Sequence, residues 1–320
     1  MKNLILTGVQ STGIPHLGNI LGSIQPAIEL SKTTSTILFV ADVHSLTTIR
    51  DAKIRVQNTR AVAAAYVALG FDTTNNILFK QSDRPEATEL QFYLNCLTPF
   101  TLLQNSHAFK DKSDNLSDIN VGVFTYPTLM AADILLYGAT HVPVGKDQMQ
   151  HLEIARDLAR KFNNQYGEFL TIPDPVIQNM TQVVVGTDGR KMSKSYGNTI
   201  NVFSDEKSIV KQVKSIVTDS TPVEMPKNPN TCNLFNIYKL VADPSRISEV
   251  QKQYLSGGLG YGKLKMELAG TLIEKYQGPR KHFNELVQST ELDHILKDGK
   301  KKAGEIAQRK IQIIRDVLGL

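Results

Sequence analysis

The stretch of sequence that decides the fold reads NLILTGVQSTGIPHLGN and spans residues 3–19. Its apolar start, residues 3–7, is long enough for one buried strand and ends at Gly8. Apolar residues then recur at helical spacing as far as Ile28, and Pro26 is expected to bend or shorten this helix. A strand, a glycine-containing turn and a helix in this order predict the first unit of a doubly wound sheet.

The same alternation continues along the chain. Apolar runs at residues 36–43 and 77–79 predict two further strands, separated by an alanine-rich helix over residues 52–69. The predicted class is therefore α/β, with a doubly wound, Rossmann-like parallel sheet that binds ligands beyond the carboxyl ends of its strands. Further strands are expected at 141–144 and 182–185, and further helices at 128–137 and 147–162.

A chain of 320 residues, 41% of them hydrophobic, is long enough for two domains. We expect residues 1–200 to form the Rossmann-like domain, with a mainly helical insertion near residues 85–140. Helical periodicity dominates residues 201–320 and predicts a second, all-helical C-terminal domain. The pattern also allows the last helix to pack back on the first domain.

Composition narrows the class of protein. The two cysteines, Cys96 and Cys232, lack metal-binding or disulfide spacing, which favours a reducing cytoplasm. No apolar run approaches about 18 residues, and the N-terminus turns polar too early for a signal peptide, so no membrane association is expected. A formal charge of +5 permits a polyanionic partner but is weak evidence for one.

The first candidate motif joins the predicted first strand to the first helix. Glycines at 8, 13 and 18 let the backbone approach a ligand, and the helix N-terminus offers unpaired N–H groups to a phosphate. Taken alone, this segment is better explained as an ordinary strand-to-helix turn in which His16 is a structural histidine.

The second candidate motif is KMSKS at residues 191–195, which follows the turn-forming residues 187–190. Two lysines and two serine hydroxyls on a mobile loop can hold the β- and γ-phosphates of ATP as charge moves onto departing pyrophosphate. The alternative is a solvated loop, because short Lys/Ser strings arise often by chance.

The joint occurrence of both motifs favours function over chance. HLGN at residues 16–19 resembles the HIGH element of the class I aminoacyl-tRNA synthetases, and KMSKS matches their second element unchanged. Residues 122–138 (GVFTYPTLMAADILLYG) and 142–162 resemble the tryptophanyl-tRNA synthetases, and the resemblance covers most of the chain. A tyrosyl enzyme, a cofactor adenylyltransferase and an inactive RNA-binding paralogue remain alternatives.

The resemblance implies ATP-dependent activation of L-tryptophan to tryptophanyl-adenylate, release of pyrophosphate, and transfer to tRNA(Trp). The catalytic residues it implies are His16, Asn19, Lys191, Ser193 and Lys194. The ATP-binding residues it implies are Gln10, Ser11, Thr12, Gly18, Asn19, Gly145, Lys146, Asp147, Val184, Lys191, Met192, Ser193, Lys194 and Ser195. Lys146 stands where the family usually has glutamate, and Ser11 and Ile14 also depart from its pattern, which puts their side-chain roles in doubt.

Asp133 is the candidate specificity residue. It lies in the apolar segment MAADILL, where an unpaired carboxylate is costly to bury, so it needs a hydrogen-bond donor. The resemblance implies that this donor is the indole N–H of tryptophan, whereas a basic neighbour or a helix cap is the alternative. The other tryptophan-binding residues it implies are Met130, Leu6, His44, Tyr126, Val142, Val144 and Gln148. Core packing explains the apolar members nearly as well.

The resemblance also implies partners. A Mg²⁺ ion is expected to be bound mainly through ATP, so no protein metal ligand is assigned. The C-terminal domain is expected to contact the tRNA anticodon, and the family forms homodimers. Lysines near residues 297–302 suit an RNA backbone, although a solvated helix surface is the more common meaning of such a run.

Overall fold

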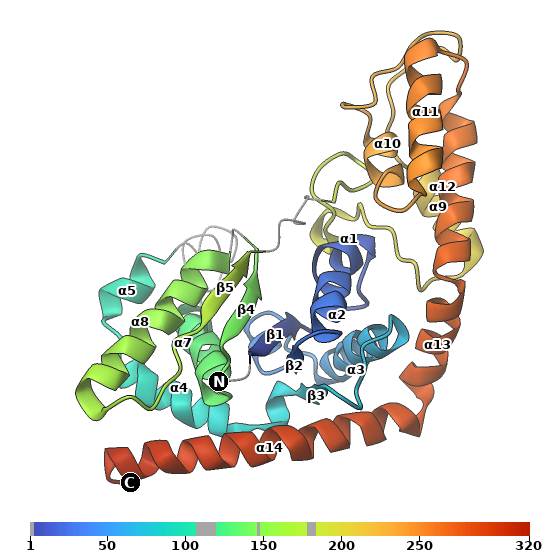
Figure 1. The fold of residues 1–320 in the computed structure, drawn as a ribbon. Coiled ribbons are helices and arrows are strands. Elements are labelled where there is room, and N and C mark those ends of the chain that lie inside the picture. Colours follow the sequence, from blue (N-terminus) through green and yellow to red (C-terminus); the bar gives the residue numbers. More distant parts are fainter. Residues whose placement is uncertain (1–2, 107–119, 146–147, 178–183) are drawn as a thin grey trace. The chain divides into compact units, whose positions relative to one another are not determined.

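The computed structural model describes residues 3–106, 120–145, 148–177 and 184–320 (Figure 1). The chain forms two compact units that interleave along the sequence. The sheet unit consists of Met1–Gly13, Ala27–Asn179 and Ser289–Leu320, and the helical unit of Ile14–Pro26 and Met180–Gln288. The predicted functional division at residue 200 stays a prediction, because these units describe compactness alone.

A five-stranded, all-parallel sheet forms the centre of the sheet unit. Its strands are β1 (Leu4–Gln10), β2 (Ser35–Ala41), β3 (Ile77–Lys80), β4 (His141–Val144) and β5 (Asp174–Ile177). The spatial order is β3-β2-β1-β4-β5, so the direction of winding reverses between β1 and β4. This order confirms the doubly wound α/β prediction, and ligands of such sheets bind beyond the strand ends where the order reverses.

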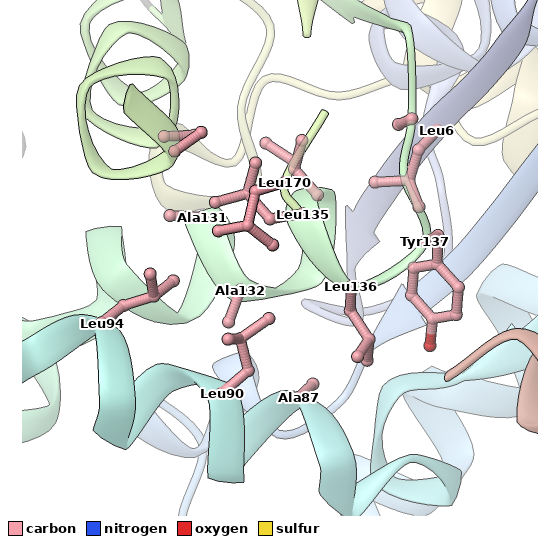
Figure 2. Packing of buried hydrophobic residues seen from close by; sticks show 14 of the residues in the cluster. Leu6, Ala87, Leu90, Leu94, Ala131, Ala132, Leu135, Leu136, Tyr137 and Leu170 are labelled. Atoms are coloured by element: carbon pink, nitrogen blue, oxygen red, sulfur yellow. The ribbon is translucent and has the colours of Figure 1, made fainter. Parts of the chain in front are cut away.

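Helices and a large apolar core surround this sheet. The helices are α3 (Ala52–Ala68), α4 (Pro85–Leu97), α5 (Phe100–Gln104), α7 (Val121–Leu136), α8 (Met149–Tyr166) and α14 (Thr290–Leu318), with 3₁₀ turns η2 (His44–Thr47) and η3 (Gln81–Asp83). Figure 2 shows how Leu90 and Leu94 of α4 face Ala131, Ala132 and Leu135 of α7. Because α7 is buried on most sides, any polar group it carries needs a partner inside the protein.

The C-terminal helix α14 packs against β3 and α4. Its Gly299 approaches the sheet so closely that a Cβ atom would lie 1.8 Å from the carbonyl oxygen of Leu78. Near its end, the guanidinium of Arg315 donates two hydrogen bonds to Glu89 on α4, at 2.7 and 2.6 Å. Tight backbone packing and a bidentate ion pair together fix this helix to the sheet unit.

The described part of the helical unit contains helices and turns. These are α1 (Leu17–Asn19), the π-helix η1 (Ile20–Ile24), η5 (Lys194–Tyr196), α9 (Glu206–Lys214), α10 (Asn233–Tyr238), α11 (Pro244–Ser256), α12 (Tyr261–Lys275) and α13 (Gln277–Gln288); α2 (Gln25–Ser31) continues from η1 into the sheet unit. The Gln25 N–H bonds to the Ile20 carbonyl, which is the wider π spacing. Pro26 follows directly and lacks the N–H donor of a regular helical residue. The change to π spacing therefore lies beside the proline that was expected to disturb this helix.

Candidate active site

The HLGN segment forms a tightly capped helix start in the helical unit. His16 has an extended backbone, and its Nδ1 accepts a hydrogen bond from the Asn19 N–H at 3.3 Å. In return, the Asn19 side-chain oxygen accepts from the His16 N–H at 3.1 Å. This reciprocal cap satisfies two backbone donors and fixes both side chains at the helix N-terminus.

The KMSKS segment packs directly on this helix start. The Gly18 N–H points to the Met192 sulfur at 3.2 Å, and the Leu17 N–H donates to the Ile200 carbonyl at 2.8 Å. A Cβ atom on Gly18 would lie 3.1 Å from the His16 ring and 3.2 Å from Met192 Cβ, so glycine allows the close approach. Two motifs separated by 174 residues, counted from Gly18 to Met192, thus converge in one compact unit.

The charges of this motif pair, residues 16–19 with 191–195, are shaped by burial. Burial first, and the charge of Lys194 second, lower the pKa of His16 to about 4, so its ring is neutral at pH 7. Because Nδ1 accepts a hydrogen bond, the ring proton lies on Nε2, where it can be donated. Exclusion of water by neighbouring atoms lowers the pKa of Lys194 to about 8, so most of its charge remains at pH 7.

Asn198 orders the KMSKS loop and was missed by reasoning from the sequence. Its buried side chain accepts from the Ser193 N–H at 2.8 Å and donates to the Lys191 carbonyl at 3.1 Å and to Asp188 at 2.6 Å. A Cβ atom on Gly186 would lie only 2.2 Å from the Asn198 amide nitrogen. The loop therefore folds around one buried amide, and no single-sequence pattern identifies such a residue.

Asp133 lies on α7 in the sheet unit with 4% of its surface exposed. Its Oδ2 accepts a hydrogen bond from the Gln81 amide at 2.6 Å. Burial raises the pKa of Asp133 well above its usual range, the Gln81 bond opposes this, and the charge of Asp42 adds to it. The sequence predicted that this carboxylate needs a donor, with the indole N–H as the implied donor and a basic neighbour or a helix cap as the alternative; among the described residues the donor to Oδ2 is the Gln81 amide, which the sequence did not predict.

Gln81 and three residues with aromatic rings complete what we call the Asp133 cluster: His44, Gln81, Tyr126, Asp133 and His151. The Gln81 side-chain oxygen accepts from the His44 N–H at 3.0 Å. The ring of Tyr126 meets His44 edge-on, with centroids 4.8 Å apart, and its hydroxyl lies 2.9 Å from His151 Nε2. Gln81 and His151 were not predicted as site residues: Gln81 lies outside every motif quoted from the sequence, and His151 lies within residues 142–162 but had no role assigned to it.

The remaining predicted residues divide between the two units. Leu6, Val142 and Val144 belong to the buried core of the sheet unit, with Met130 packed against it. Gln10 ends β1 and is followed by buried Ser11 and exposed Thr12. Gly145 follows β4, and its carbonyl accepts a hydrogen bond from the Gln148 N–H at 2.9 Å. Val184 lies in the helical unit, where its carbonyl accepts from the Met192 N–H at 2.8 Å. Lys146 and Asp147 fall outside the described residues.

Known proteins resemble this chain over almost its full length. The family model for class I tRNA synthetases of the W and Y group matches residues 2–277. A tryptophan–tRNA ligase of Fusobacterium nucleatum is 44% identical over 98% of this chain and 97% of its own length, and one of Campylobacter jejuni is 44% identical over 99% of both. The chain belongs to the class I tryptophanyl-tRNA synthetases. This confirms the family and enzyme class predicted from the sequence.

Solved tryptophanyl-tRNA synthetases share the fold. The Campylobacter jejuni enzyme, complexed with ADP and tryptophan, superposes with a TM-score of 0.94, covering 99% of this chain and 100% of that one at 44% identity. The Mycoplasma pneumoniae enzyme gives a TM-score of 0.84 at 29% identity, covering 100% of this chain and 98% of the other. Similarity of this extent supports a common architecture for both compact units of this chain.

Two further findings concern metals and membranes. Within residues 3–106, 120–145, 148–177 and 184–320, no three His, Cys, Asp or Glu side chains gather closely enough to hold a metal ion. Of the helices in the same part of the chain, none combines the length and apolar character that crossing a membrane requires.

Proposed function

We propose that this chain activates L-tryptophan with ATP and transfers it to tRNA(Trp). The tryptophan carboxylate attacks the α-phosphorus of ATP, which forms tryptophanyl-adenylate and releases pyrophosphate. The adenylate then passes its aminoacyl group to a hydroxyl of the terminal adenosine of the tRNA. The observation that carries the proposal is the convergence of HLGN and KMSKS in a chain of this family.

The motif pair is proposed to act on the phosphates. A reaction of this kind needs no side-chain nucleophile, and its rate depends on positioning and on stabilising the charge of the leaving pyrophosphate. Lys191, Ser193 and Lys194 take this second role, with Lys194 contributing most of its charge at neutral pH. Neutral His16 donates from Nε2 to a phosphate oxygen, and Asn19 holds its ring in place.

The Asp133 cluster is proposed to recognise the indole. Gln81 leaves the second carboxylate oxygen of Asp133 available, and that oxygen accepts the indole N–H. A competing side chain without a donor would leave the buried carboxylate short of a partner, which is a costly mismatch. His44, Tyr126 and Gln148 then serve the ammonium and carboxylate ends of the substrate.

Magnesium and RNA complete the proposed reaction. Mg²⁺ is held through the ATP phosphate oxygens and neutralises part of their charge, while the described protein residues contribute hydrogen-bond donors and cations. Residues 201–320 are proposed to contact the tRNA anticodon. Exposed Lys297, Lys300 and Lys301 on α14 add a positive surface suited to an RNA backbone.

A cytoplasmic homodimer is the proposed working form. The exposed apolar residues of α4, α5 and α7 support an interface there: Phe92 is 66% exposed, Phe100 65% and Val121 75%. Side chains of this kind are enriched at protein interfaces. Sedimentation at micromolar concentration tests this assembly, and Phe100→Asp is expected to shift the protein towards monomer.

ATP–pyrophosphate exchange with each of the amino acids in turn tests the function. We expect exchange with tryptophan and little with tyrosine. Exchange with tyrosine instead would replace the proposal by the tyrosyl alternative. Binding of tRNA without exchange for any amino acid would replace it by the inactive RNA-binding paralogue.

A further inference from the structure

Gln81 connects two functional segments that are distant in sequence. It is the first residue of η3, directly after β3, and only 2% of its surface is exposed. Its Nε2 donates to Asp133 Oδ2 at 2.6 Å, and its Oε1 accepts from the His44 N–H at 3.0 Å. Both polar atoms of the amide therefore form hydrogen bonds. The opposite orientation of the amide is unfavourable, because its oxygen would face the Asp133 carboxylate and its nitrogen would face the His44 backbone N–H.

Neighbouring bonds hold Gln81 in this position. The next residue, Ser82, donates to Asp42 through its backbone N–H at 2.8 Å and through its hydroxyl at 2.6 Å. Asp42 directly follows β2, and His44 begins η2 two residues later. The turns after β2 and β3 are thus joined at the carboxyl ends of these strands, the edge where doubly wound sheets bind their ligands.

The bond from Gln81 occupies one oxygen of the Asp133 carboxylate. Among the described residues, Gln81 is the only hydrogen-bond donor to Asp133, and it uses Oδ2. A carboxylate held by one oxygen has a fixed plane, so the direction of the lone pairs on Oδ1 is fixed as well. A hydrogen bond that orients a ligand-binding side chain commonly determines how tightly that side chain binds the ligand.

We propose that Gln81 is a specificity-determining positioning residue: it orients the Asp133 carboxylate for the indole N–H and couples it to the segment that carries His44. The inference rests on the proposed role of Asp133 in tryptophan recognition. Gln81 itself does not contact the reacting atoms. It acts through Asp133, by fixing the geometry of the carboxylate and by a hydrogen bond that favours its ionised form.

The first test is Gln81→Met, which keeps the length of the side chain and removes both hydrogen bonds. We expect the KM for tryptophan to rise about 10- to 100-fold, the range expected for loss of a hydrogen bond to a charged group. The KM for ATP and the kcat should change by less than about threefold. An unchanged tryptophan KM would overturn the inference.

A matched control lies at the other end of the same strand. Asn76 precedes β3, is 5% exposed, accepts from the Thr36 N–H at 2.9 Å and donates to the Ser31 carbonyl at 3.3 Å. Asn76→Leu therefore removes another buried amide that links β3 to the β2 segment. It should lower stability without raising the tryptophan KM, and an equal rise in both variants would assign Gln81 a structural role only.

The pH dependence separates orientation from simple packing. The titratable members of the Asp133 cluster besides Asp133 are His44, Tyr126 and His151. Two further groups interact with the Asp133 carboxylate: Asp42, whose charge raises the pKa of Asp133, and Tyr137 at the end of α7, whose own pKa is raised by burial and by the charge of Asp133. A donated hydrogen bond stabilises the carboxylate, so its loss raises the pKa of Asp133. In Gln81→Met the acid limb of kcat/KM for tryptophan should move to higher pH. An unmoved limb would contradict the positioning role.

A double-mutant cycle with Asp133→Ala separates the role of Asp133 from that of Gln81. If Asp133→Ala leaves tryptophan activation intact, the proposed function of Asp133 fails. If Asp133→Ala impairs activation but Gln81→Met does not, only the role of Gln81 fails. If both variants impair activation, Gln81→Met should have a much smaller effect in the Asp133→Ala background, because the two residues act as one unit.

Discussion

The motif pair of the helical unit and the Asp133 cluster of the sheet unit are built in opposite ways. The motif pair consists of two contiguous segments that meet through the Gly18 N–H and the Met192 sulfur, and its two lysines are exposed. The Asp133 cluster consists of single buried residues from η2, η3, α7 and α8, joined by hydrogen bonds to side chains and by the ring contact between His44 and Tyr126. The first arrangement suits a loop that must move with a leaving group, and the second suits discrimination of one rigid ring.

The largest expected effect comes from the motif pair. Lys194→Ala should lower the rate of adenylate formation on the order of 10³-fold, because it removes a cation that stabilises the leaving pyrophosphate. Tryptophan binding should change only a few-fold. Single-turnover adenylation and equilibrium tryptophan binding measure the two quantities, and an equal loss of both would remove the contrast between the two regions.

The next effect belongs to the Asp133 cluster. Asp133→Ala should lower kcat/KM for tryptophan on the order of 10²-fold, since a buried hydrogen-bond acceptor for the indole is lost. Pyrophosphate exchange with tryptophan and with phenylalanine measures the change in selectivity. If selectivity stays the same, another residue determines the substrate and the cluster is structural.

A measurement of the free energy of unfolding tests how closely α14 packs against β3 in the sheet unit. Gly299→Ala should lower the free energy of unfolding by about 1–3 kcal/mol, because the new Cβ collides with the Leu78 carbonyl in β3. Gly270→Ala on α12 is the control, since nothing lies within 4 Å of its Cβ position. The control should gain up to about 1 kcal/mol from helix propensity. Urea denaturation compares them, and a gain in both would show that α14 is not held closely.

The last prediction concerns the acid stability of the helical unit. The pKa of His16 is about 4 when folded and 6.5 ordinarily, so the unfolded chain binds more protons between these values. The free energy of unfolding should therefore fall as the pH falls from 6.5 to 4, by at most about 1.4 kcal/mol per pH unit from this group. His16→Asn keeps a capping oxygen and should flatten this slope, whereas an identical slope would mean that His16 titrates normally.

Much of the fold was predicted from periodicity, and the exceptions share a cause. Strands β1 to β4 and helices α3 and α8 lie close to their expected ranges, because strong apolar patterns mark them. Strand β5 was missed, since DPVI is short and contains a proline. The strand expected at 182–185 falls partly outside the described residues, and Val185 forms an isolated bridge to Lys191.

The site was predictable to the same degree and for the same reason. HLGN and KMSKS are each a continuous run of residues, so both could be identified from the sequence alone. Asn198, Gln81 and His151 gave no such signal, because a glutamine after a strand or a histidine in an amphipathic helix is ordinary. Their importance depends on which other segment their side chains meet.

The sequence by itself determined the alternation of strands and helices, the class of sheet and the two phosphate-binding segments. These depend on local backbone preferences and on the spacing of apolar residues along the chain. Only the tertiary structure decided that β1 lies between β2 and β4, and that Gln81 links Asp133 to His44. The physical reason is that a buried side-chain hydrogen bond requires two atoms to meet within about 3 Å, a condition set by the packing of distant elements.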